Sequence, residues 1–431
     1  MNGSPSKFCS AQYLMKIVMM IETIKVAASL FVDSYEEKDF SCYFEQSQAI
    51  LSGEMDYSQV SSRAGPLVYP AMSTYINILL YKFVGSEGTY FRPVQVINGL
   101  TYLVWIFCMV RIAQLAFKDN IERANIVIIN WFTFTTLNIM VEGTFNDAYC
   151  VMFSMLAVWQ FQKSRIVVGI VLISLAISCK MSAALYLPAV YLIASKTHGI
   201  FRGTLLIMVV FWLQILLAYP YVSVFPREYL ASAYDFSRSF AAHNSFNWGF
   251  VSETIMVSKL FKNMLLLLHL FFLAYFLFSK WQKVGTMVRD LGVYPVWIFN
   301  KLSRPSSFHV AEVFFVCNFI GIIFSRGLYY QYVSWYTLTI PFLLEISFMK
   351  FWELKTKDLV IFVVALDSIY ALRAISNTIS PTIGQIMLAT VFWFIVAANV
   401  KRQKTSSPSY SLPLPDSSVN WTKDNKSFFK Q

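Results

Sequence analysis

The sequence predicts an all-α polytopic membrane protein, and two observations lead to that prediction: its composition and the placement of its charges. Of the 431 residues, 57% are apolar and only 14% are charged. Soluble domains carry roughly 25% charged and about 45–50% apolar residues. Grouped into blocks of roughly 20, the apolar residues would supply on the order of ten to twelve spanning helices, and we expect about 11–12.

The basic residues fall in short clusters between apolar blocks, at 280–304, 350–357 and 401–404. Cytoplasmic loops of membrane proteins carry such an excess of Lys and Arg. Membrane topology therefore accounts for the net charge of +11, and nucleic acid is not an expected partner.

The first predicted span, residues 13–32, contains Lys16, Glu22 and Lys25 and lacks a small-residue cleavage site. We expect a retained signal anchor that follows a cytosolic segment, residues 1–12. The later spans are predicted at 66–84, 93–116, 125–141, 148–161, 166–195, 203–222, 260–279, 309–324, 331–349, 358–376 and 383–400. The spans form one membrane domain, 13–400, and the Ser-, Pro- and Lys-rich segment 401–431 is predicted to be a disordered cytosolic tail.

With the basic loops and the tail in the cytosol, the segments 33–65, 223–259 and 325–331 face the other compartment. They hold most of the polar and aromatic residues that call for a functional explanation. No internal repeat or matching pair of broken spans is apparent, which disfavours a transporter. The six cysteines form no CxxC pair and the four histidines are far apart, so neither a metal nor another cofactor is expected.

An acidic loop, Tyr35–Phe40, follows the first span. A carboxylate held beside aromatic residues at a membrane interface can act as a general base, although a solvated acidic cluster at a helix end is the alternative. The next span begins after Arg63 with Gly65 and two prolines in 65–70, which indicates a fixed turn that either starts the helix or supports the acidic loop.

The break at Glu142–Asp147 predicts either a helix cap or a polar cavity. Counting spans places this break on the cytosolic side, opposite the acidic loop, unless a span is misdrawn or the segment is re-entrant. Lys180, in the middle of 166–195, predicts a phosphate or carboxylate partner, because it lies too far from either end of the run to snorkel easily.

Two later segments add arginines among aromatic and amide side chains. The loop 223–259 carries Asp235, Arg238, His243, Asn247 and Trp248, and Ser325–Gln331 carries Arg326. Arginine can bind a phosphate through two parallel hydrogen bonds, whereas an aromatic belt with an ordinary arginine is the alternative. Together these segments suit a lipid phosphate whose tail lies in the membrane.

These residues resemble a known family, the dolichyl-phosphate-mannose α-1,3-mannosyltransferases of N-glycan precursor assembly. Gly65–Pro70 matches the family's GPLVYP letter for letter, and Tyr35–Phe40 is similar to its YTEIDW element. The other matching pieces are Phe145–Asp147 (FND), Lys180–Met181 (KM), Asn247–Trp248 (NW), Asn318–Gly321 (NFIG), Phe324–Arg326 (FSR), Tyr330–Gln331 (YQ) and Trp335–Tyr336 (WY).

The resemblance implies a GT-C glycosyltransferase bundle in the endoplasmic-reticulum membrane, with its active site in the lumen. The donor would be dolichyl-phosphate mannose and the acceptor the pentamannosyl dolichyl-diphosphate oligosaccharide. Because the donor is β-linked and the product α-linked, the reaction would invert configuration in one displacement. Asp39 stands where the base is expected. The residues implied in substrate binding are Glu37, Tyr69, Asn146, Asp147, Lys180, Arg238, Asn247, Trp248, Arg326, Tyr330 and Gln331.

Four positions depart from the family pattern: Arg63, Gly143, Asn244 and Tyr329. Gly143 replaces an arginine and Tyr329 a histidine, so the acceptor preference is left open. The alternatives are a mannosyltransferase of glycosylphosphatidylinositol assembly and, from another class, a lipid or solute transporter.

Overall fold

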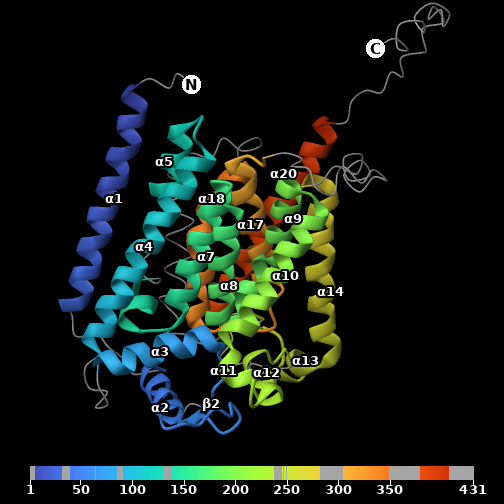
Figure 1. Cartoon of the computed structure of the whole chain (residues 1–431). Helices are drawn as coiled ribbons and strands as arrows, with labels where there is room; N and C mark the ends of the chain where they lie inside the picture. Colours follow the sequence, from blue (N-terminus) through green and yellow to red (C-terminus); the bar gives the residue numbers. More distant parts are fainter. Residues whose placement is uncertain are drawn as a thin grey trace, which may run out of the picture.

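The computed structural model confirms the all-α fold, with a two-residue strand pair as the sheet found in the described part of the chain (Figure 1). The structure describes residues 5–31, 39–63, 65–84, 91–129, 137–236, 245, 247–248, 250–281, 304–348 and 379–406. Side chains are not described at 5–11, 138, 330, 379–381 and 401–406.

The elements of the first half include two short non-α helices, the π-helix η1 and the 3₁₀ helix η2. They are α1 (Pro5–Phe31), α2 (Phe40–Leu51), β1 (Ser61–Ser62), β2 (Gly65–Pro66), α3 (Ala71–Val84), α4 (Arg92–Ala116), α5 (Ile121–Ile129), η1 (Asn138–Glu142), α7 (Asp147–Gln162), α8 (Ile166–Cys179), η2 (Met181–Tyr186), α9 (Leu187–His198) and α10 (Ile200–Leu217).

The second half continues with short helices and then long ones. They are α11 (Tyr219–Val222), α12 (Pro226–Ala233), α13 (Glu253–Val257), α14 (Lys259–Phe276), η4 (Leu277–Trp281), α17 (Ser307–Ile323), η5 (Tyr330–Trp335), η6 (Thr337–Thr339), α18 (Ile340–Phe348) and α20 (Ile379–Ser406). The last helix therefore continues six residues beyond the end of the span predicted at 383–400.

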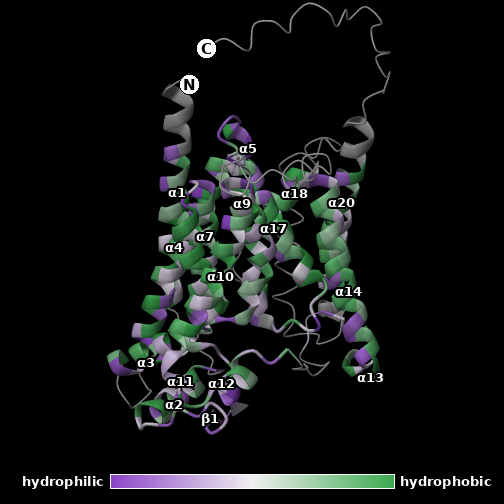
Figure 2. Cartoon of the chain, turned by 45° about the vertical axis from the view of Figure 1, so that its right-hand side comes forward, coloured by the Kyte–Doolittle hydropathy of each residue, from purple (hydrophilic) through white to green (hydrophobic). Residues whose placement is uncertain are grey.

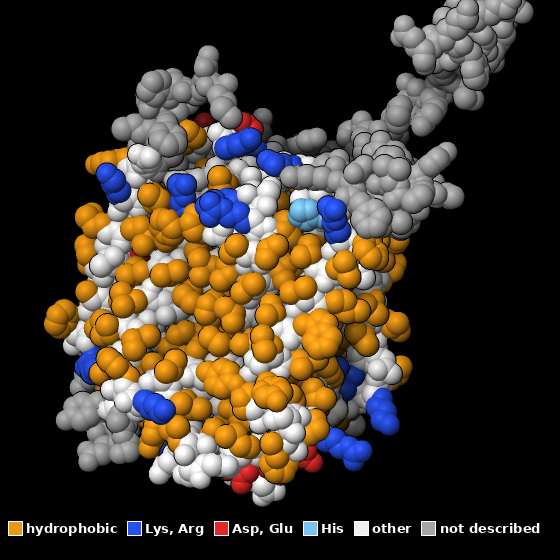
Figure 3. All heavy atoms as spheres, in the orientation of Figure 1, with side chains coloured by type: hydrophobic (Ala, Val, Ile, Leu, Met, Phe, Trp, Pro, Cys, Tyr) orange, Lys and Arg blue, Asp and Glu red, His pale blue; other side chains and the backbone are white. Residues whose placement is uncertain are grey.

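Four segments of the described chain are long and apolar enough to cross a membrane: α4, α10, 259–281 and 382–400. Helices α8 and α17 are apolar but shorter. The outer faces of α10 and α14 expose large side chains such as Trp212 (68%) and Leu267 (67%). Hydrophobic residues predominate along the long helices (Figure 2), and apolar side chains form a broad belt across the bundle with Lys and Arg above and below it (Figure 3). Such a belt identifies a membrane protein.

The two ends of the bundle differ in structure. The start of α1 and the finish of α20 lie at one end, whereas α2, the β1–β2 pair, α3 and α11–α13 gather at the other (Figure 1). We call the latter the site end. It is the end that the sequence places away from the cytosol.

The predicted span 66–84 is wrong. The helix there, α3, has 14 residues, whereas a span needs about 20. It lies across the site end of the bundle (Figure 1) and packs against α2, α4 and α8. Its apolar residues are explained by this packing, and one crossing of the membrane is thereby removed from the span count.

The predicted span 166–195 is also broken by the structure. Helix α8 ends at Cys179, Lys180 is extended (φ −155°, ψ 127°), and η2 leads into α9. Pro188 lies in the first turn of α9, where the missing N–H has no helical partner to lose. Lys180 therefore stands at a helix end, not within a continuous span.

Glu22 and Lys25 of α1 are paired with each other, and Glu22 also contacts a neighbouring helix. Glu22 accepts a hydrogen bond from the Tyr102 hydroxyl of α4 (2.8 Å) and pairs with Lys25 (3.0 Å). Ser29 donates to the Glu142 carboxylate of η1 (2.9 Å). These contacts explain how a helix with Glu and Lys can pack against the bundle, because buried charges are stable when they are paired.

Candidate active site

A cavity of about 780 Å³ lies at the site end of the bundle. Its residues come from segments far apart in the sequence: α2, the β1–β2 pair, the loop before α3, the break after α8, α14 and the end of α17 with η5. Those used below are Asp39, Cys42, Tyr43, Gln46, Ser62, Gly65, Tyr69, Phe145, Lys180, Asp235, Lys262, Leu265, Leu266, His269, Phe324, Arg326, Tyr329, Gln331, Tyr332 and Trp335.

Asp39 is the N-cap residue of α2, but its side chain makes no capping hydrogen bond. Its backbone carbonyl accepts the Tyr43 N–H at 3.2 Å, and its side chain lines the cavity. An N-cap Asp usually accepts a hydrogen bond from the first helical turn. The carboxylate of Asp39 is therefore not used as a helix cap, and Asp39 belongs to the cavity wall.

The β1–β2 pair and the turn after it form the rim beside α2. Ser62 pairs with Gly65, and Gly65 has a φ of +118°, a backbone conformation that side-chain-bearing residues rarely adopt. Arg63 does not reach the cavity centre, because its guanidinium is paired with Glu45 (3.0 Å) and is 62% exposed. Arg63 thus does not replace the charge of the arginine that the family carries at position 143.

Tyr69 follows this turn and lines the cavity. Burial raises the pKa of its phenol to about 12, although nearby Lys180 opposes the increase. The phenol therefore remains protonated at neutral pH and can donate a hydrogen bond to a ligand.

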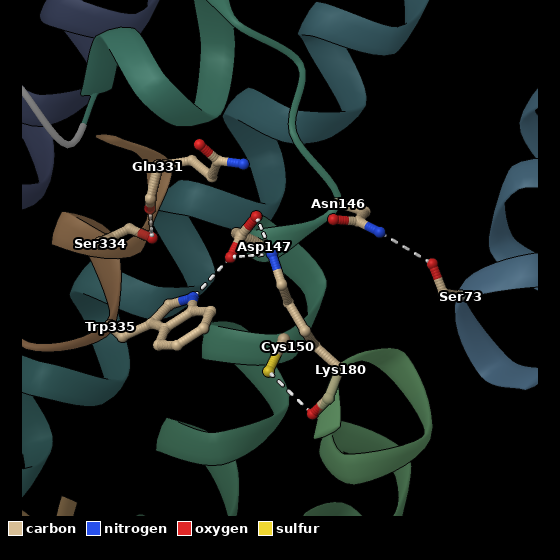
Figure 4. Close-up of polar contacts among 8 residues, drawn as sticks. All are labelled: Ser73, Asn146, Asp147, Cys150, Lys180, Gln331, Ser334 and Trp335. Atoms are coloured by element: carbon tan, nitrogen blue, oxygen red, sulfur yellow. Dashed lines mark hydrogen bonds and ion pairs between the residues drawn. The ribbon is translucent and has the colours of Figure 1, made fainter. Parts of the chain in front are cut away.

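Asp147 and Lys180 form a buried ion pair (Figure 4), and Lys180 is part of the cavity wall. The Lys180 ammonium donates to Oδ1 (2.8 Å) and Oδ2 (2.7 Å) of Asp147, and the Trp335 indole N–H also donates to Oδ1. Both side chains are almost fully buried: 8% of the Lys180 side chain and 1% of the Asp147 side chain are exposed. Of the partners predicted for Lys180, the structure therefore provides the carboxylate.

Aromatic rings surround the Lys180 ammonium on the cavity side. Its Nζ lies 4.5 Å from the centroid of Tyr332, 5.2 Å from Trp335 and 5.6 Å from Tyr69. Ring faces attract cations at these distances. An ammonium has three N–H donors and Asp147 takes two, which leaves one for a ligand.

The sequence left open which side Asp147 faces, and the structure places it at the same end of the bundle as Asp39. Asp39, Phe145 and Lys180 line one cavity, and Lys180 contacts Asp147 directly. The cytosolic count came from α3, which was counted as a crossing although it stays at the site end.

Asn146, the residue before Asp147, does not line the cavity. Its side-chain amide donates to the Ser73 hydroxyl of α3 (3.0 Å) (Figure 4).

Gly143 has a structural explanation. A Cβ at this position would lie 2.7 Å from the ring of Phe145. A larger residue such as arginine would therefore require the ring to move. Glycine here allows Phe145 to occupy its place in the cavity wall.

Asn247 and Trp248 were predicted to contact substrate, but neither lines the cavity. The Asn247 amide donates to the Ser325 carbonyl (2.8 Å) and its Oδ1 accepts from the Leu328 N–H (2.9 Å). The Trp248 indole donates to the same Ser325 carbonyl (2.8 Å). The pair therefore fixes the segment that carries Arg326, because its polar atoms already have protein partners.

Arg326, Gln331 and Tyr329 line the cavity as their segment predicts. The Arg326 guanidinium donates to the Phe236 carbonyl. The Ser334 hydroxyl donates to the Gln331 carbonyl (2.7 Å) within the short helix η5, which lies beside Asp147 (Figure 4).

Other predicted residues cannot be placed. Glu37, Arg238, His243 and Asn244 lie outside the described residues, and only the backbone of Tyr330 is described.

Sequence reasoning missed Lys262 and His269, both on the cavity-lining face of α14. They are seven residues apart in an otherwise apolar helix, which is two helical turns. Polar residues at this spacing in a membrane helix could have indicated a shared polar face. It also missed Tyr43 and Gln46, which lie in a short helix that was treated as a loop.

Within the described residues, no group of three His, Cys, Asp or Glu side chains is placed to hold a metal ion. The cavity instead provides two carboxylate residues, Asp39 and the predicted Asp235, and the cationic side chains of Lys180, Lys262 and Arg326. The fold and the cavity thus define an integral membrane protein with a polar, cation-bearing site at one end of an apolar helical bundle.

Comparison with known proteins identifies the family. The protein-family model described as ALG3 protein matches residues 16–367. The chain therefore belongs to this family. It is 31% identical to a Kluyveromyces lactis protein over 352 residues, covering 77% of this chain and 75% of the relative. It is 30% identical to a human protein over 316 residues, covering 72% and 70% respectively. Both relatives are named Dol-P-Man:Man(5)GlcNAc(2)-PP-Dol alpha-1,3-mannosyltransferase.

An Arabidopsis thaliana protein of the same name is 29% identical over 350 residues, covering 76% of each chain. Among solved structures, ArnT from Cupriavidus metallidurans bound to undecaprenyl phosphate is similar over 93% of this chain and 78% of its own, with 12% identity and a TM-score of 0.39. The family resemblance inferred from the motifs is confirmed.

Proposed function

We propose that this chain transfers mannose from dolichyl-phosphate mannose to the pentamannosyl dolichyl-diphosphate oligosaccharide, in α-1,3 linkage, on the luminal side of the endoplasmic-reticulum membrane. Family membership and the names of the relatives support this transferase activity over the glycosylphosphatidylinositol and transporter alternatives. In this proposal the bundle is of the GT-C type and its site end faces the lumen.

One observation carries the mechanism: Asp39 lines the same cavity as Arg326 and Lys262. The carboxylate comes from α2, outside the membrane helices, whereas Lys262 lies in the first turn of the membrane helix α14. A base and a phosphate site on different walls are what a single displacement requires, because nucleophile and leaving group must lie on opposite faces of the anomeric carbon.

In the proposed reaction, the Asp39 carboxylate takes the proton from the 3-hydroxyl of the acceptor mannose. The resulting oxygen attacks the anomeric carbon of the β-linked donor, the bond to the phosphate oxygen breaks, and dolichyl phosphate leaves. Arg326 and Lys262 stabilise the negative charge that develops on the phosphate. No residue in this scheme needs a metal ion.

In this scheme Lys180 does not neutralise the phosphate directly. Its charge is balanced by Asp147, so it holds η5 and the Tyr69 turn around the cavity and offers one remaining N–H to the donor.

Expression of this chain in a cell mutant that accumulates the pentamannosyl lipid-linked oligosaccharide tests the proposal. We expect the intermediate to disappear and larger lipid-linked oligosaccharides to form. Persistence of the intermediate, with the chain correctly localised in the endoplasmic reticulum, would contradict the assigned acceptor.

A further inference from the structure

One face of α2 lines the cavity. Asp39, Cys42, Tyr43 and Gln46 all contribute to its wall. Residues three, four and seven apart lie on the same face of a helix. From Asp39 to Gln46 this face extends about 10 Å, at 1.5 Å per residue. The α2 wall therefore begins at the proposed base and continues toward the β1–β2 rim.

Two polar atoms on this wall have no partner. The Tyr43 hydroxyl and the Gln46 carbonyl oxygen are both buried and make no hydrogen bond with any described residue. The two side chains are only 5% and 7% exposed. Buried polar groups in native proteins are nearly always hydrogen-bonded. Two unpaired atoms on the wall of one cavity therefore indicate a ligand that supplies their partners.

Both side chains are held in place without use of these atoms. The Gln46 amide N–H donates weakly to the Ser62 hydroxyl (3.3 Å) and the Gly65 carbonyl (3.4 Å), so its other end, the carbonyl oxygen, is oriented away from the rim. The Tyr43 ring packs edge-on to Tyr69, with 5.9 Å between centroids. Burial raises the pKa of Tyr43 well above its ordinary value, and Tyr69, Asp39 and Asp147 add to this effect. Tyr43 is thus a neutral phenol that can donate a hydrogen bond.

The chemistry of these atoms identifies the class of ligand. The carbonyl oxygen of Gln46 can only accept a hydrogen bond, so its partner must be a donor. An ionised phosphate offers acceptors and does not satisfy it. A sugar hydroxyl can both donate to Gln46 and accept from Tyr43. The α2 wall therefore fits the hydroxyl groups of a sugar.

Lining residues from other helices indicate which of the two sugars binds along α2. Leu265 and Leu266 of α14 and Phe324 at the end of α17 also line the cavity, with Lys262 and Arg326. Apolar and cationic side chains together suit the lipid phosphate of the donor. Since the donor is fixed there by its phosphate, the polar α2 wall remains for the acceptor.

We propose that α2 forms a binding subsite for the acceptor glycan, in which the Tyr43 hydroxyl and the Gln46 carbonyl oxygen hydrogen-bond to mannose hydroxyl groups next to Asp39. This inference rests on the proposed function and extends it. It assigns α2 two tasks along one face: proton removal at its first residue and acceptor recognition along its next two turns.

The test is steady-state kinetics of the full chain in detergent with Tyr43→Phe and Gln46→Met, varying each substrate separately. Loss of one hydrogen bond to a neutral hydroxyl is expected to raise the KM for the acceptor about fivefold to tenfold in each variant. The KM for dolichyl-phosphate mannose should stay within about twofold. Thermal stability should not fall in Tyr43→Phe, because the hydroxyl that is removed bonds to no described residue.

Tyr57→Phe is the matched control. The Tyr57 hydroxyl is buried and bonds to Thr74 (3.0 Å), and it does not line the cavity. Its loss should lower thermal stability and leave both KM values unchanged.

Three results would overturn the subsite. An unchanged acceptor KM in both variants would show that the two atoms do not contact the acceptor. A rise in the donor KM alone would place them on the donor sugar. Absence of mannosyl transfer by the unmodified chain would remove the proposed function and the subsite together, and is thus distinguishable from the first two results.

Discussion

Replacement of Asp39 by asparagine is expected to reduce mannosyl transfer by about 10²–10⁴-fold, the usual contribution of a general base. The asparagine keeps the shape of the side chain but cannot accept the proton of the acceptor hydroxyl. The Asp39 side chain makes no capping bond to α2, so the helix should not depend on its charge. We therefore expect the loss in kcat, with expression and thermal stability close to those of the unmodified chain.

Asp56→Asn provides the control. Asp56 lies in the same segment at the site end, and its carboxylate accepts hydrogen bonds from the Ser58 N–H (2.8 Å) and hydroxyl (2.7 Å). It does not line the cavity, so this variant should retain activity. Full activity in Asp39→Asn would remove Asp39 as the base.

Lys180→Met is expected to destabilise the protein by about 3–5 kcal/mol, because it leaves the buried Asp147 carboxylate without its cation. Asp147 is 1% exposed and so is not stabilised by solvent. Mannosyl transfer should fall as well, since Tyr69, Tyr332 and Trp335 all pack around the lost ammonium. Unfolding in mixed micelles and initial rates measure the two effects.

A double-mutant cycle separates the ion pair from other effects of the substitution. Asp147→Asn together with Lys180→Met should be less destabilised than the sum of the single variants, by about 1–3 kcal/mol. Strict additivity would show that the two side chains do not stabilise each other. Arg123→Met breaks the partly buried pair with Glu345 (2.7 Å), away from the cavity. It should lower stability and leave the KM values unchanged.

The residues of the site could be predicted in part because charged side chains are rare in this chain and conspicuous in its apolar runs. Lys180, Arg326 and the acidic loop were singled out on that basis, and the family resemblance indicated Asp39 within the loop. The structure places Asp39, Lys180 and Arg326 around one cavity. Their relation to one another could not be predicted. That Lys180 is paired with Asp147 depends on the approach of α7 to the end of α8, which is a property of tertiary packing.

Two errors in the predicted spans have one physical origin. An apolar run shows that a segment is shielded from water, but not whether it crosses the membrane. Helix α3 is apolar because it packs against α4 and α8 at the site end, and residues 166–195 are apolar although the chain is interrupted at Lys180. A hydropathy pattern cannot distinguish these cases from full crossings. Counting α3 as a crossing is also why the simple span count set Asp147 opposite the acidic loop.

Asn247 and Trp248 show a different limit. Amide and indole groups suit sugar recognition, and the pair matches a family motif, yet their hydrogen bonds go to the segment 325–328. Conversely, Tyr43 and Gln46 were passed over although both line the cavity and each has a buried polar atom with no hydrogen bond to a described residue. Residue type suggests which bonds a side chain can make, but only the structure shows which of them are already satisfied.

The most direct test of the central claim is a transfer assay with the purified chain, dolichyl-phosphate mannose and the pentamannosyl dolichyl-diphosphate oligosaccharide. The product should contain one additional mannose, and NMR of the released glycan should show an α linkage to a 3-hydroxyl. A β linkage, a different linkage position, or no transfer by a folded preparation would contradict the account.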